Sequence, residues 1–290
     1  MRFIYITDIH GDVNKYEKIL EIAIKEKIKY IIDGGDMLPK KINRLEGQPI
    51  YLKKFLKKYF DKLKKHNITY LGMLGNDDIF PMDKMFNDLC KKYDNIHNIA
   101  SNKIELENYE FIGMNFILDH PFGCKDRVVM EDNFIFQNQL STPFFYSEKG
   151  DRIEVPNWFE YATNKLPKMK DILNQLPLPV NNQKSVYIMH MPPADLKLGQ
   201  LLYQDLDIGS KDISNFIEEK QPLLTMHGHI HESPDTKTGK WINLIKNTTC
   251  IQPGQTEIDS NILIYADIDL DNKKYTREKI NLDFEINETD

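Results

Sequence analysis

The chain has 290 residues, of which 41% are hydrophobic and 28% charged, a composition typical of a globular protein. Its net charge of −6 at pH 7 argues against binding of nucleic acid by bulk positive charge, and no apolar run is long enough to span a membrane. The three cysteines, Cys90, Cys124 and Cys250, are scattered and odd in number, which favours a reducing, cytoplasmic location over a disulfide framework.

Predicted strands and helices alternate through the first third of the chain. The strands are short β-branched and aromatic runs, at residues 2–7, 30–33 and 69–74. Helices are expected over 13–27, 50–66 and 81–93. The second of these has apolar residues at i, i+3 and i+4, and its lysine-rich opposite face is interpreted as solvated, with an anionic partner as the alternative. The alternation predicts parallel strands joined by crossover helices.

The middle of the chain departs from this alternation. Residues 103–107 and 110–116 are expected to form a hairpin around Asn108. Residues 117–160 are rich in aromatic side chains but have little periodicity. We interpret them as an irregular insertion, which is either a lid over a site or a set of loops that covers the core.

Helices and strands return in the C-terminal part. One helix is expected over 160–176, where Pro167 limits its start, and another over 211–220 with Ser210 as its N-cap. Further strands are predicted at 185–190, 223–231 (running into a loop), 248–255 (stopped by a Pro-Gly turn) and 261–270. The last dozen residues are polar, and we expect them to be partly disordered. Since no linker divides the chain, a single domain is expected over residues 1–290.

Side chains that bind metals follow the predicted strands. Asp8 and His10 come directly after the first strand, and in an extended segment residues i and i+2 project to the same side. We therefore expect both to reach one metal. The other places are Gly34-Gly35-Asp36, Gly75-Asn76-Asp77-Asp78, His190, and His229-Ile230-His231. The carboxyl ends of strands in an open α/β sheet gather at one edge, where ligand sites form.

The chemistry of this set fits a pair of metal ions. Two metals about 3.5–4 Å apart clamp a phosphate ester and activate a water molecule. Imidazole and carboxylate ligands suit Mn, Fe, Zn, Co or Ni. Because the motifs contain no cysteine, a structural zinc site with thiolate ligands is disfavoured. Two carboxylates against two divalent cations leave about two positive charges, which suits an anionic phosphate. Taken alone, most of these motifs are more typical of a turn or a structural residue. His-Gly-His-x-His is the strongest single indication of metal binding. The prediction therefore rests on the placement of all the motifs at strand ends.

On these motifs the sequence resembles the calcineurin-like metallophosphoesterase superfamily, especially its small prokaryotic-type members. The resemblance runs from Asp8 to about Gln255. It implies an α/β fold, a four-layer αββα sandwich of two mixed β-sheets flanked by helices.

The resemblance also implies ligand assignments for two divalent ions, with Mn, Fe or Zn expected. A hydroxide that bridges the two metals would attack phosphorus in line with the leaving oxygen. Asp36 would be shared between the metals. The first metal would be held by Asp8, His10, Asp36 and His231, and the second by Asp36, Asn76, His190 and His229.

One departure from the family pattern concerns the leaving group. In many members the Asn is followed by a His that assists the leaving group, whereas here that position is Asp77. An ordinary aspartate is ionised at neutral pH and cannot donate a proton, so we expect slow hydrolysis of esters with poor leaving groups, unless Asp77 is kept protonated or the substrate supplies its own acid. The candidate catalytic residues are Asp36, Asn76, Asp77 and Asp78, with Asp78 orienting the ligands from behind.

The sequence thus predicts a dinuclear metal-dependent phosphoesterase acting on a phosphate ester. The missing His favours a phosphodiester, with a phosphomonoester as the alternative. A non-catalytic protein-binding scaffold on the same fold is a second alternative, disfavoured because every ligand position is filled. A third is a binuclear hydrolase of another ester or amide. His227 is interpreted as structural, or alternatively as a contact behind the ligands or to substrate, and the sequence indicates neither the natural substrate nor the oligomeric state.

Overall fold

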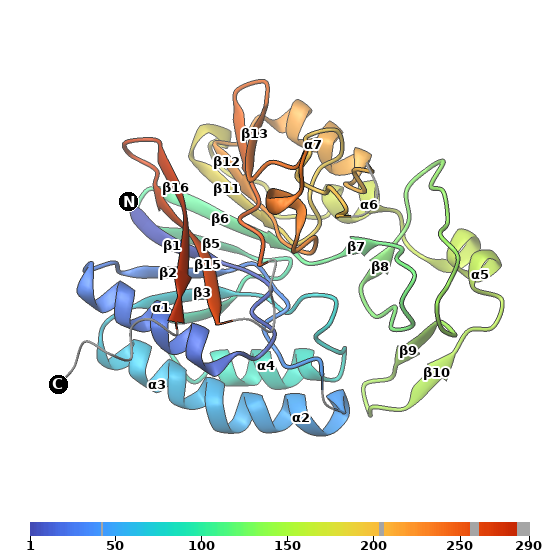
Figure 1. Ribbon diagram of the computed structural model, residues 1–290, viewed down its shortest axis with the longest axis horizontal. Coiled ribbons are helices and arrows are strands. Elements are labelled where there is room, and N and C mark those ends of the chain that lie inside the picture. The colour runs from blue at the N-terminus through green and yellow to red at the C-terminus, as the bar shows by residue number, and fades with distance from the viewer. Residues whose placement is uncertain (42, 203–205, 256–260, 283–290) are drawn as a thin grey trace.

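Two six-stranded β-sheets face each other at the centre of the molecule (Figure 1). The computed structural model describes residues 1–41, 43–202, 206–255 and 261–282. The first sheet has the order β16-β15-β1-β2-β3-β4. Its strands β1 to β4 are parallel. Strand β15 pairs antiparallel with β1, and β16 pairs antiparallel with β15 at the edge. Their bounds are Arg2–Ile6, Tyr30–Asp33, Thr69–Gly72 and Ile96–Asn98 for β1 to β4, and Ile262–Asp269 and Lys274–Asn281 for β15 and β16.

The second sheet is also mixed and has the order β13-β14-β12-β11-β6-β5. Strands β6, β11, β12 and β14 are parallel, while β5 and β13 pair antiparallel at the two edges. The bounds are Lys103–Leu106 (β5), Tyr109–Met114 (β6), Ser185–Met189 (β11), Leu224–Met226 (β12), Ile242–Ile245 (β13) and Thr248–Ile251 (β14).

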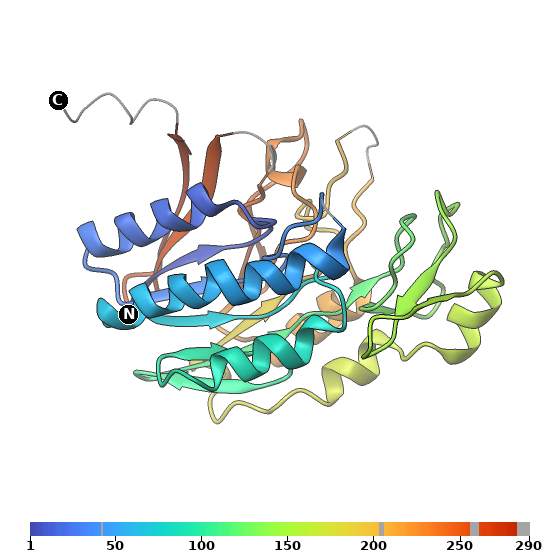
Figure 2. The same ribbon diagram turned by 90° about the horizontal axis from the view of Figure 1, so that it is seen from below.

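Helices cover the outer face of each sheet, which Figure 2 shows from a second direction. The first sheet is covered by α1 (Val13–Lys25), α2 (Arg44–Tyr51), a π-helical segment (Leu52–Leu56), α3 (Lys57–Lys65) and α4 (Met82–Cys90). The second is covered by α6 (Met169–Asn174) and α7 (Lys211–Lys220). This arrangement confirms the expected four-layer αββα sandwich.

Apolar side chains between the sheets hold the two halves of the sandwich together. Phe3 and Tyr5 of β1 are fully buried, as are Phe111 of β6 and Ile188 of β11, and all four belong to one core cluster. The rings of Phe3 and Phe111 meet edge to face, with centroids 5.8 Å apart. Since burial of one such side chain contributes about 1.5–3 kcal/mol, this layer fixes how the two sheets sit against each other.

The predicted helices form where capping and spacing favour them. Ser210 caps α7 as expected, because its side chain accepts a hydrogen bond from the Ile213 amide at 3.1 Å. The predicted helix over 50–66 begins earlier, at Arg44, and includes the π-helical segment.

The single helix expected over 160–176 is wrong. The segment is divided into α5 (Trp158–Lys165) and α6, because the chain around Pro167 pairs with Met130 instead of continuing the helix. The Met130 amide donates to Pro167 O, and the Met169 amide donates to Met130 O.

Strands β4, β13 and β16 were not predicted. The first two are only three and four residues long, and β16 is an edge strand with many charged side chains. Strand β16 reaches Asn281, and together with Leu282 it accounts for the first four of the last dozen residues. Residues 283–290, on which the rest of the disorder prediction falls, lie outside the described residues.

Residues 117–160 project from one end of the sandwich (Figure 1). They contain two small sheets, β7 with β8 and β9 with β10, and the start of α5. The Lys125 ammonium is fully buried there and donates to Asp119 at 2.7 Å, and the Trp158 indole donates to the same carboxylate at 2.9 Å. The strand bounds are Ile117–Leu118, Val128–Val129, Phe144–Tyr146 and Arg152–Glu154. Among the described residues, no helix combines the length and apolar character needed to cross a membrane.

Candidate metal centre

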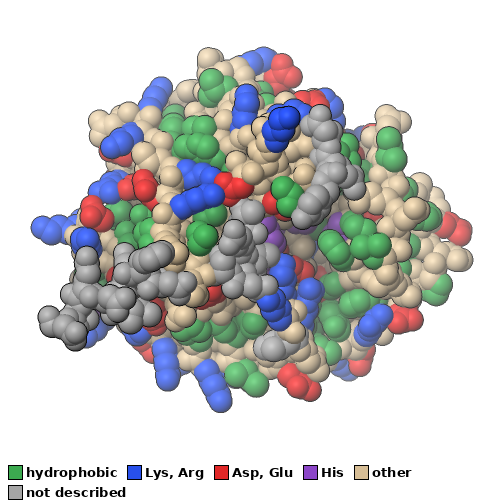
Figure 3. Space-filling view, viewed as in Figure 1, with side chains coloured by type: hydrophobic (Ala, Val, Ile, Leu, Met, Phe, Trp, Pro, Cys, Tyr) green, Lys and Arg blue, Asp and Glu red, His purple; other side chains and the backbone are tan. Residues whose placement is uncertain are grey.

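The predicted ligands lie in loops just beyond the carboxyl ends of five strands. Asp8 and His10 follow β1, Asp36 follows β2, and Asn76 follows β3. On the second sheet, His190 follows β11, and His229 and His231 follow β12. The structure brings these loops together in a hollow on the face drawn in Figure 3, where histidine side chains lie beside lysine and arginine side chains.

The backbone at the ligand positions is left-handed rather than extended. The φ angles are +59° at Asp8, +49° at His10, +53° at Asp36 and +68° at His229. The expectation that Asp8 and His10 project together from an extended segment is therefore wrong, since β1 already ends at Ile6. Left-handed backbone at non-glycine residues costs roughly 1–3 kcal/mol each and collects at functional sites.

Backbone hydrogen bonds between loops hold this geometry in place. The Asp8 amide donates to Gly35 O at 2.9 Å, and the His10 amide donates to Asp36 O at 2.9 Å. The loops after β1 and β2 are thereby fixed to each other, so both carboxylates keep one relative position.

Four side chains converge on a single point. Ligand atoms of Asp8, His10, Asp36 and His231 all lie within 4.8 Å of one another. The Nε2 atoms of His10 and His231 are 3.2 Å apart, and His231 Nε2 is 3.3 Å from Asp8 Oδ1. The side chains of Asp8, His10 and Asp36 are almost completely buried, and that of His231 is 16% exposed. Two buried carboxylates and two imidazoles around one point form a donor set that fits a divalent cation.

A second group of donors adjoins the first through Asp36. His190 Nε2 lies 3.0 Å from Asn76 Oδ1 and 3.5 Å from Asp36 Oδ2. His190 Nδ1 donates to Gly34 O at 2.9 Å, so the proton sits on Nδ1 and Nε2 is free to accept a metal. The rings of His190 and His229 are 5.4 Å apart between centroids. Asp36 therefore has one carboxylate oxygen near both groups.

Two glycines let the loops approach the carboxylates. A Cβ added at Gly75 would lie 2.2 Å from Asp36 Oδ1, and one added at Gly228 would lie 2.7 Å from Asp8 Oδ2. No side chain fits at such distances, which explains in physical terms why a glycine precedes Asn76 and His229 in their motifs.

Asp78 supports the loops and does not face the cluster. Its carboxylate accepts hydrogen bonds from the amides of Met37, Leu38 and Gly75 at 3.1, 2.8 and 2.8 Å. Burial, and after it the charge of Asp36, raises the pKa of this carboxyl well above its ordinary value. Asp78 thus ties the loop after β2 to the loop after β3.

Sequence reasoning missed Arg127, which supports the same loop from the insertion. Its buried guanidinium donates through Nε to Gly75 O at 2.7 Å and also binds Asp83. Nothing in the sequence marks Arg127, because its partners are far away along the chain.

Asp77 lies at the exposed edge of the cluster, between two cations that sequence reasoning also missed. Arg44 Nη2 donates to Asp77 Oδ1 at 2.7 Å, and Lys40 Nζ lies 3.4 Å from Asp77 Oδ2. Burial and the charge of Asp36 would raise the pKa of the Asp77 carboxyl, but Arg44, His10 and Lys40 outweigh them and hold it below its ordinary value. Asp77 is therefore an ionised carboxylate.

The remaining histidines are not part of the cluster. His227 Nδ1 lies 2.9 Å from Met189 O and its Nε2 lies 2.8 Å from Thr225 Oγ1, so both ring nitrogens have structural partners. His120 Nδ1 accepts from the Phe122 amide at 3.2 Å, while its buried Nε2 has no partner among the described residues. Burial, and then the charge of Lys125, lowers the pKa of His120 to about 4.

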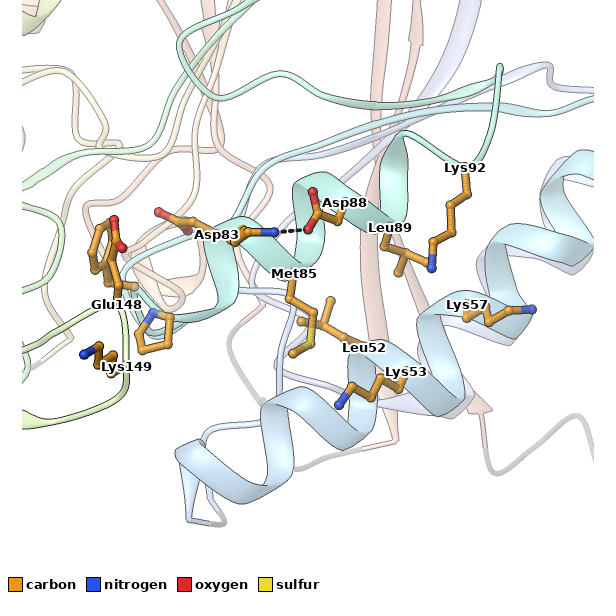
Figure 4. Close-up of a pocket in the computed structure, with 13 residues that line it drawn as sticks. Leu52, Lys53, Lys57, Asp83, Met85, Asp88, Leu89, Lys92, Glu148 and Lys149 are labelled. Carbon is orange, nitrogen blue, oxygen red and sulfur yellow. Dashed lines mark hydrogen bonds and ion pairs between the residues drawn. The ribbon is translucent and has the colours of Figure 1, made fainter.

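A separate groove of about 690 Å³ lies between the α2–α3 helix and α4 (Figure 4). Leu52, Met85 and Leu89 contribute apolar surface, and lysines such as Lys53 and Lys92 stand at its rim. None of the predicted site residues lines this groove.

A model of the calcineurin-like phosphoesterase family matches residues 1–233 of this chain. The match contains all seven predicted ligands, because the last of them is His231, and it ends before strands β13 to β16. No curated protein matches the sequence.

Solved structures resemble this fold along most of their length. One is 18% identical with a TM-score of 0.60, covering 96% of this chain and 98% of its own. A second, TT1561 of Thermus thermophilus, is 14% identical with a TM-score of 0.56, covering 97% and 98%. A dimetal phosphatase from Danio rerio is 10% identical with a TM-score of 0.50, covering 92% of each chain. At these identities the likeness is one of fold.

Proposed function

The chain belongs to the calcineurin-like phosphoesterase family and is a metal-dependent phosphoric ester hydrolase, and from this premise we propose that it cleaves phosphodiesters at a dinuclear centre shared across Asp36. Asp8, His10, Asp36 and His231 hold the first divalent ion in this proposal. Asp36, Asn76, His190 and His229 hold the second. Manganese, iron and zinc are the ions proposed, because mixed imidazole and carboxylate donors suit them.

The observation that carries the proposal is the position of Asp36. Its Oδ2 atom lies 3.9 Å from His10 Nε2 and 3.5 Å from His190 Nε2. One carboxylate is thus in reach of both donor groups, as a pair of neighbouring cations requires. When bound, such a pair supplies Lewis-acid activation of the phosphate and of water.

The protein's own residues prepare the site for an in-line displacement. The left-handed loops hold both carboxylates before substrate arrives, so no reorganisation is needed during the reaction. The Gly34 carbonyl keeps the His190 proton on Nδ1, and the burial of Asp8 and Asp36 excludes bulk water. Water attacks phosphorus on the side opposite the leaving oxygen.

The preference for a diester follows from the residue at position 77. Many members of the family have a histidine there that assists the leaving group, and this chain has Asp77 instead. Arg44 and Lys40 keep this carboxyl ionised, so it cannot protonate a leaving oxygen. We also propose that residues 1–290 form one domain in which residues 117–160 border the substrate.

The test is hydrolysis by protein stripped with chelator and reloaded with Mn²⁺, Zn²⁺ or Fe²⁺. We expect metal-dependent cleavage of bis(p-nitrophenyl) phosphate with a higher kcat/KM than for p-nitrophenyl phosphate. Asp36→Asn should lose roughly three orders of magnitude of this activity. Absence of any metal-dependent cleavage would overturn the proposal, and a preference for the monoester would overturn its diester part.

A further inference from the structure

The exposed edge of the metal centre carries an excess of positive charge. Lys40 Nζ lies 3.3 Å from His10 Nε2 and 3.4 Å from Asp77 Oδ2, and Arg44 binds the other oxygen of Asp77. Two cations against one carboxylate leave one net positive charge. The three side chains are 20–25% exposed, whereas Asp8, His10 and Asp36 behind them are at most 1% exposed.

This edge is where the substrate must project. A phosphorus atom held by the buried ligands has protein on its inner side, so its substituent extends outward past Lys40 and Arg44. Lys40 Nζ, which is 3.3 Å from the proposed ligand nitrogen of His10, lies directly beside the ligand cluster that would hold the metal and its phosphate. A group bonded directly to the scissile phosphate would therefore come close to these cations, more readily than a remote group.

Both cations retain donors for that group. Within the described residues, Arg44 engages Asp77 through Nη2 alone, and a guanidinium has five N–H donors. Lys40 has three donors that can rotate. Asp77 itself is fixed by its amide, which donates to Asp36 Oδ1 at 2.8 Å, so it holds Arg44 against the centre.

We infer that Lys40 and Arg44, positioned by Asp77, bind an anionic leaving group, and that the preferred substrates are phosphoric anhydrides whose leaving group is itself a phosphate. This inference rests on the proposed function and names its substrate class. It makes Asp77 a positioning residue.

The reaction balances without a proton donor at the edge. The oxygen of water forms a bond to the inner phosphorus, and the bond from that phosphorus to the bridging oxygen breaks. The electron pair stays on the bridging oxygen, so the leaving phosphate departs as an anion. The proton lost by the attacking water passes to solvent. A leaving phosphate is a weak base with a second pKa of about 6, so fixed positive charge stabilises its departure, whereas an alkoxide would need a proton.

The first experiment measures binding without turnover. Imidodiphosphate, which has nitrogen in place of the bridging oxygen, and orthophosphate are titrated calorimetrically into metal-loaded protein. We expect Arg44→Gln and Lys40→Met each to weaken imidodiphosphate binding about 30-fold, as for the loss of one charge-assisted hydrogen bond, with orthophosphate changed less than about 3-fold. The matched control Arg2→Gln removes an arginine that pairs with Asp267 on a distant strand edge, and it should change neither. Equal weakening of both ligands would overturn the inference.

The second experiment separates charge from structure. Wild type, Arg44→Gln and Arg44→Lys are assayed on adenosine diphosphate and on bis(p-nitrophenyl) phosphate, whose leaving group has no second phosphate. We expect Arg44→Gln to lose about 30-fold in kcat/KM on the anhydride and little on the activated ester, and Arg44→Lys to restore most of the loss. If the ester is cleaved but the anhydride is not preferentially affected, the inference fails while the proposed function stands. If neither is cleaved with any metal, the proposed function fails.

A rival source of assistance is His120, whose buried Nε2 has no hydrogen-bond partner among the described residues. If His120 protonated the leaving group, His120→Gln would remove a basic limb from the pH–rate profile on the anhydride. We expect the profile of the variant to keep its shape. Loss of that limb would overturn the inference.

Discussion

The two sheets contribute different chemistry to the proposed metal centre. Loops of the first sheet supply both carboxylates, the amide of Asn76 and one histidine, whereas loops of the second supply only imidazoles. The first set is held by hydrogen bonds between loops within one sheet. The second is held against the first by packing between the sheets, through residues such as Phe3 and Phe111, and by hydrogen bonds such as that from His190 Nδ1 to Gly34 O. Assembly of the centre is thus a consequence of sheet packing, and metal binding should stabilise that packing in return.

The largest effect is expected from removing Asp36, the carboxylate that lies near the ligand groups of both sheets. Asp36→Asn should lower kcat/KM by roughly three orders of magnitude, because the Lewis-acid contribution of bound metal is several kcal/mol. Bound metal, measured by elemental analysis, should fall from two ions to one or none. Asp94→Asn, a change at an exposed carboxylate that pairs with Lys64, is the control. Full metal content in Asp36→Asn would contradict the sharing of Asp36.

Removing a ligand of the second sheet alone should separate the two groups. His190→Ala takes away the imidazole that faces Asn76 but leaves Asp8, His10 and His231 in place. We expect activity to fall about 100-fold and one metal ion to remain, since both carboxylates are kept. Retention of two ions would contradict the role of His190 as a ligand, and loss of both would show that the two donor groups are not independent.

Metal removal tests whether the centre ties the sheets together. Saturation at 100–1,000 times Kd contributes about 2.7–4.1 kcal/mol, so chelation should lower Tm by roughly 5–10 °C. Asp36→Asn serves as the control, because its Tm should respond much less to chelator. An equal response in both proteins would place the stabilising ion elsewhere.

Restoring a histidine at the edge should change the chemistry of the leaving group by a smaller factor. Asp77→His replaces the partner of Arg44 with a group that titrates near neutral pH. We expect a several-fold gain on a diester with an alkyl leaving group, and the appearance of a basic limb in its pH–rate profile. If the variant gives no gain on this substrate, Asp77 does not limit the reaction.

The smallest expected effect concerns Asp33, a buried carboxyl group in the first sheet. The second sheet contributes only imidazoles to the proposed site and has no such group there. Burial raises the pKa of Asp33 to about 7, although hydrogen bonds from Tyr16 and Tyr70 oppose the shift. Since its pKa in the unfolded chain is about 3.9, the folded state holds the extra proton between these values. Its contribution to stability is therefore complete below about pH 4 and is lost as pH rises through about 7.

Thermal unfolding of wild type and Asp33→Asn from pH 4.5 to 8 measures this contribution. The difference in Tm between them should shift in favour of the variant as pH rises. A constant difference would contradict the raised pKa.

Sequence patterns predicted the parts of this molecule that depend on neighbouring residues. Short apolar runs located β1, β2, β3 and β11, and hence the loops that carry Asp8, Asp36, Asn76 and His190. The left-handed backbone of Asp8 and His10 was not predictable from alternation, because loop-to-loop hydrogen bonds impose it.

Contacts made across the fold were not visible in the sequence. Lys40 and Arg44 meet Asp77 from the loop after β2 and the start of α2, and nothing near them along the chain indicates this partner. The edge strand β16 was missed because half of its side chains are charged, and the strand forms through pairing with β15.

The guanidinium of Arg127 has a consequence for how this protein can change over generations. Arg127 belongs to the insertion of residues 117–160, and its guanidinium donates a hydrogen bond to the carbonyl of Gly75, directly before Asn76. If a shorter loop replaced the insertion, Gly75 O would lose the hydrogen bond from Arg127. The loop that carries Asn76 would then be held less firmly. Sequence variation in the insertion should therefore be concentrated in its outermost part. The residues around Arg127 should vary less, together with the residues of the proposed metal site.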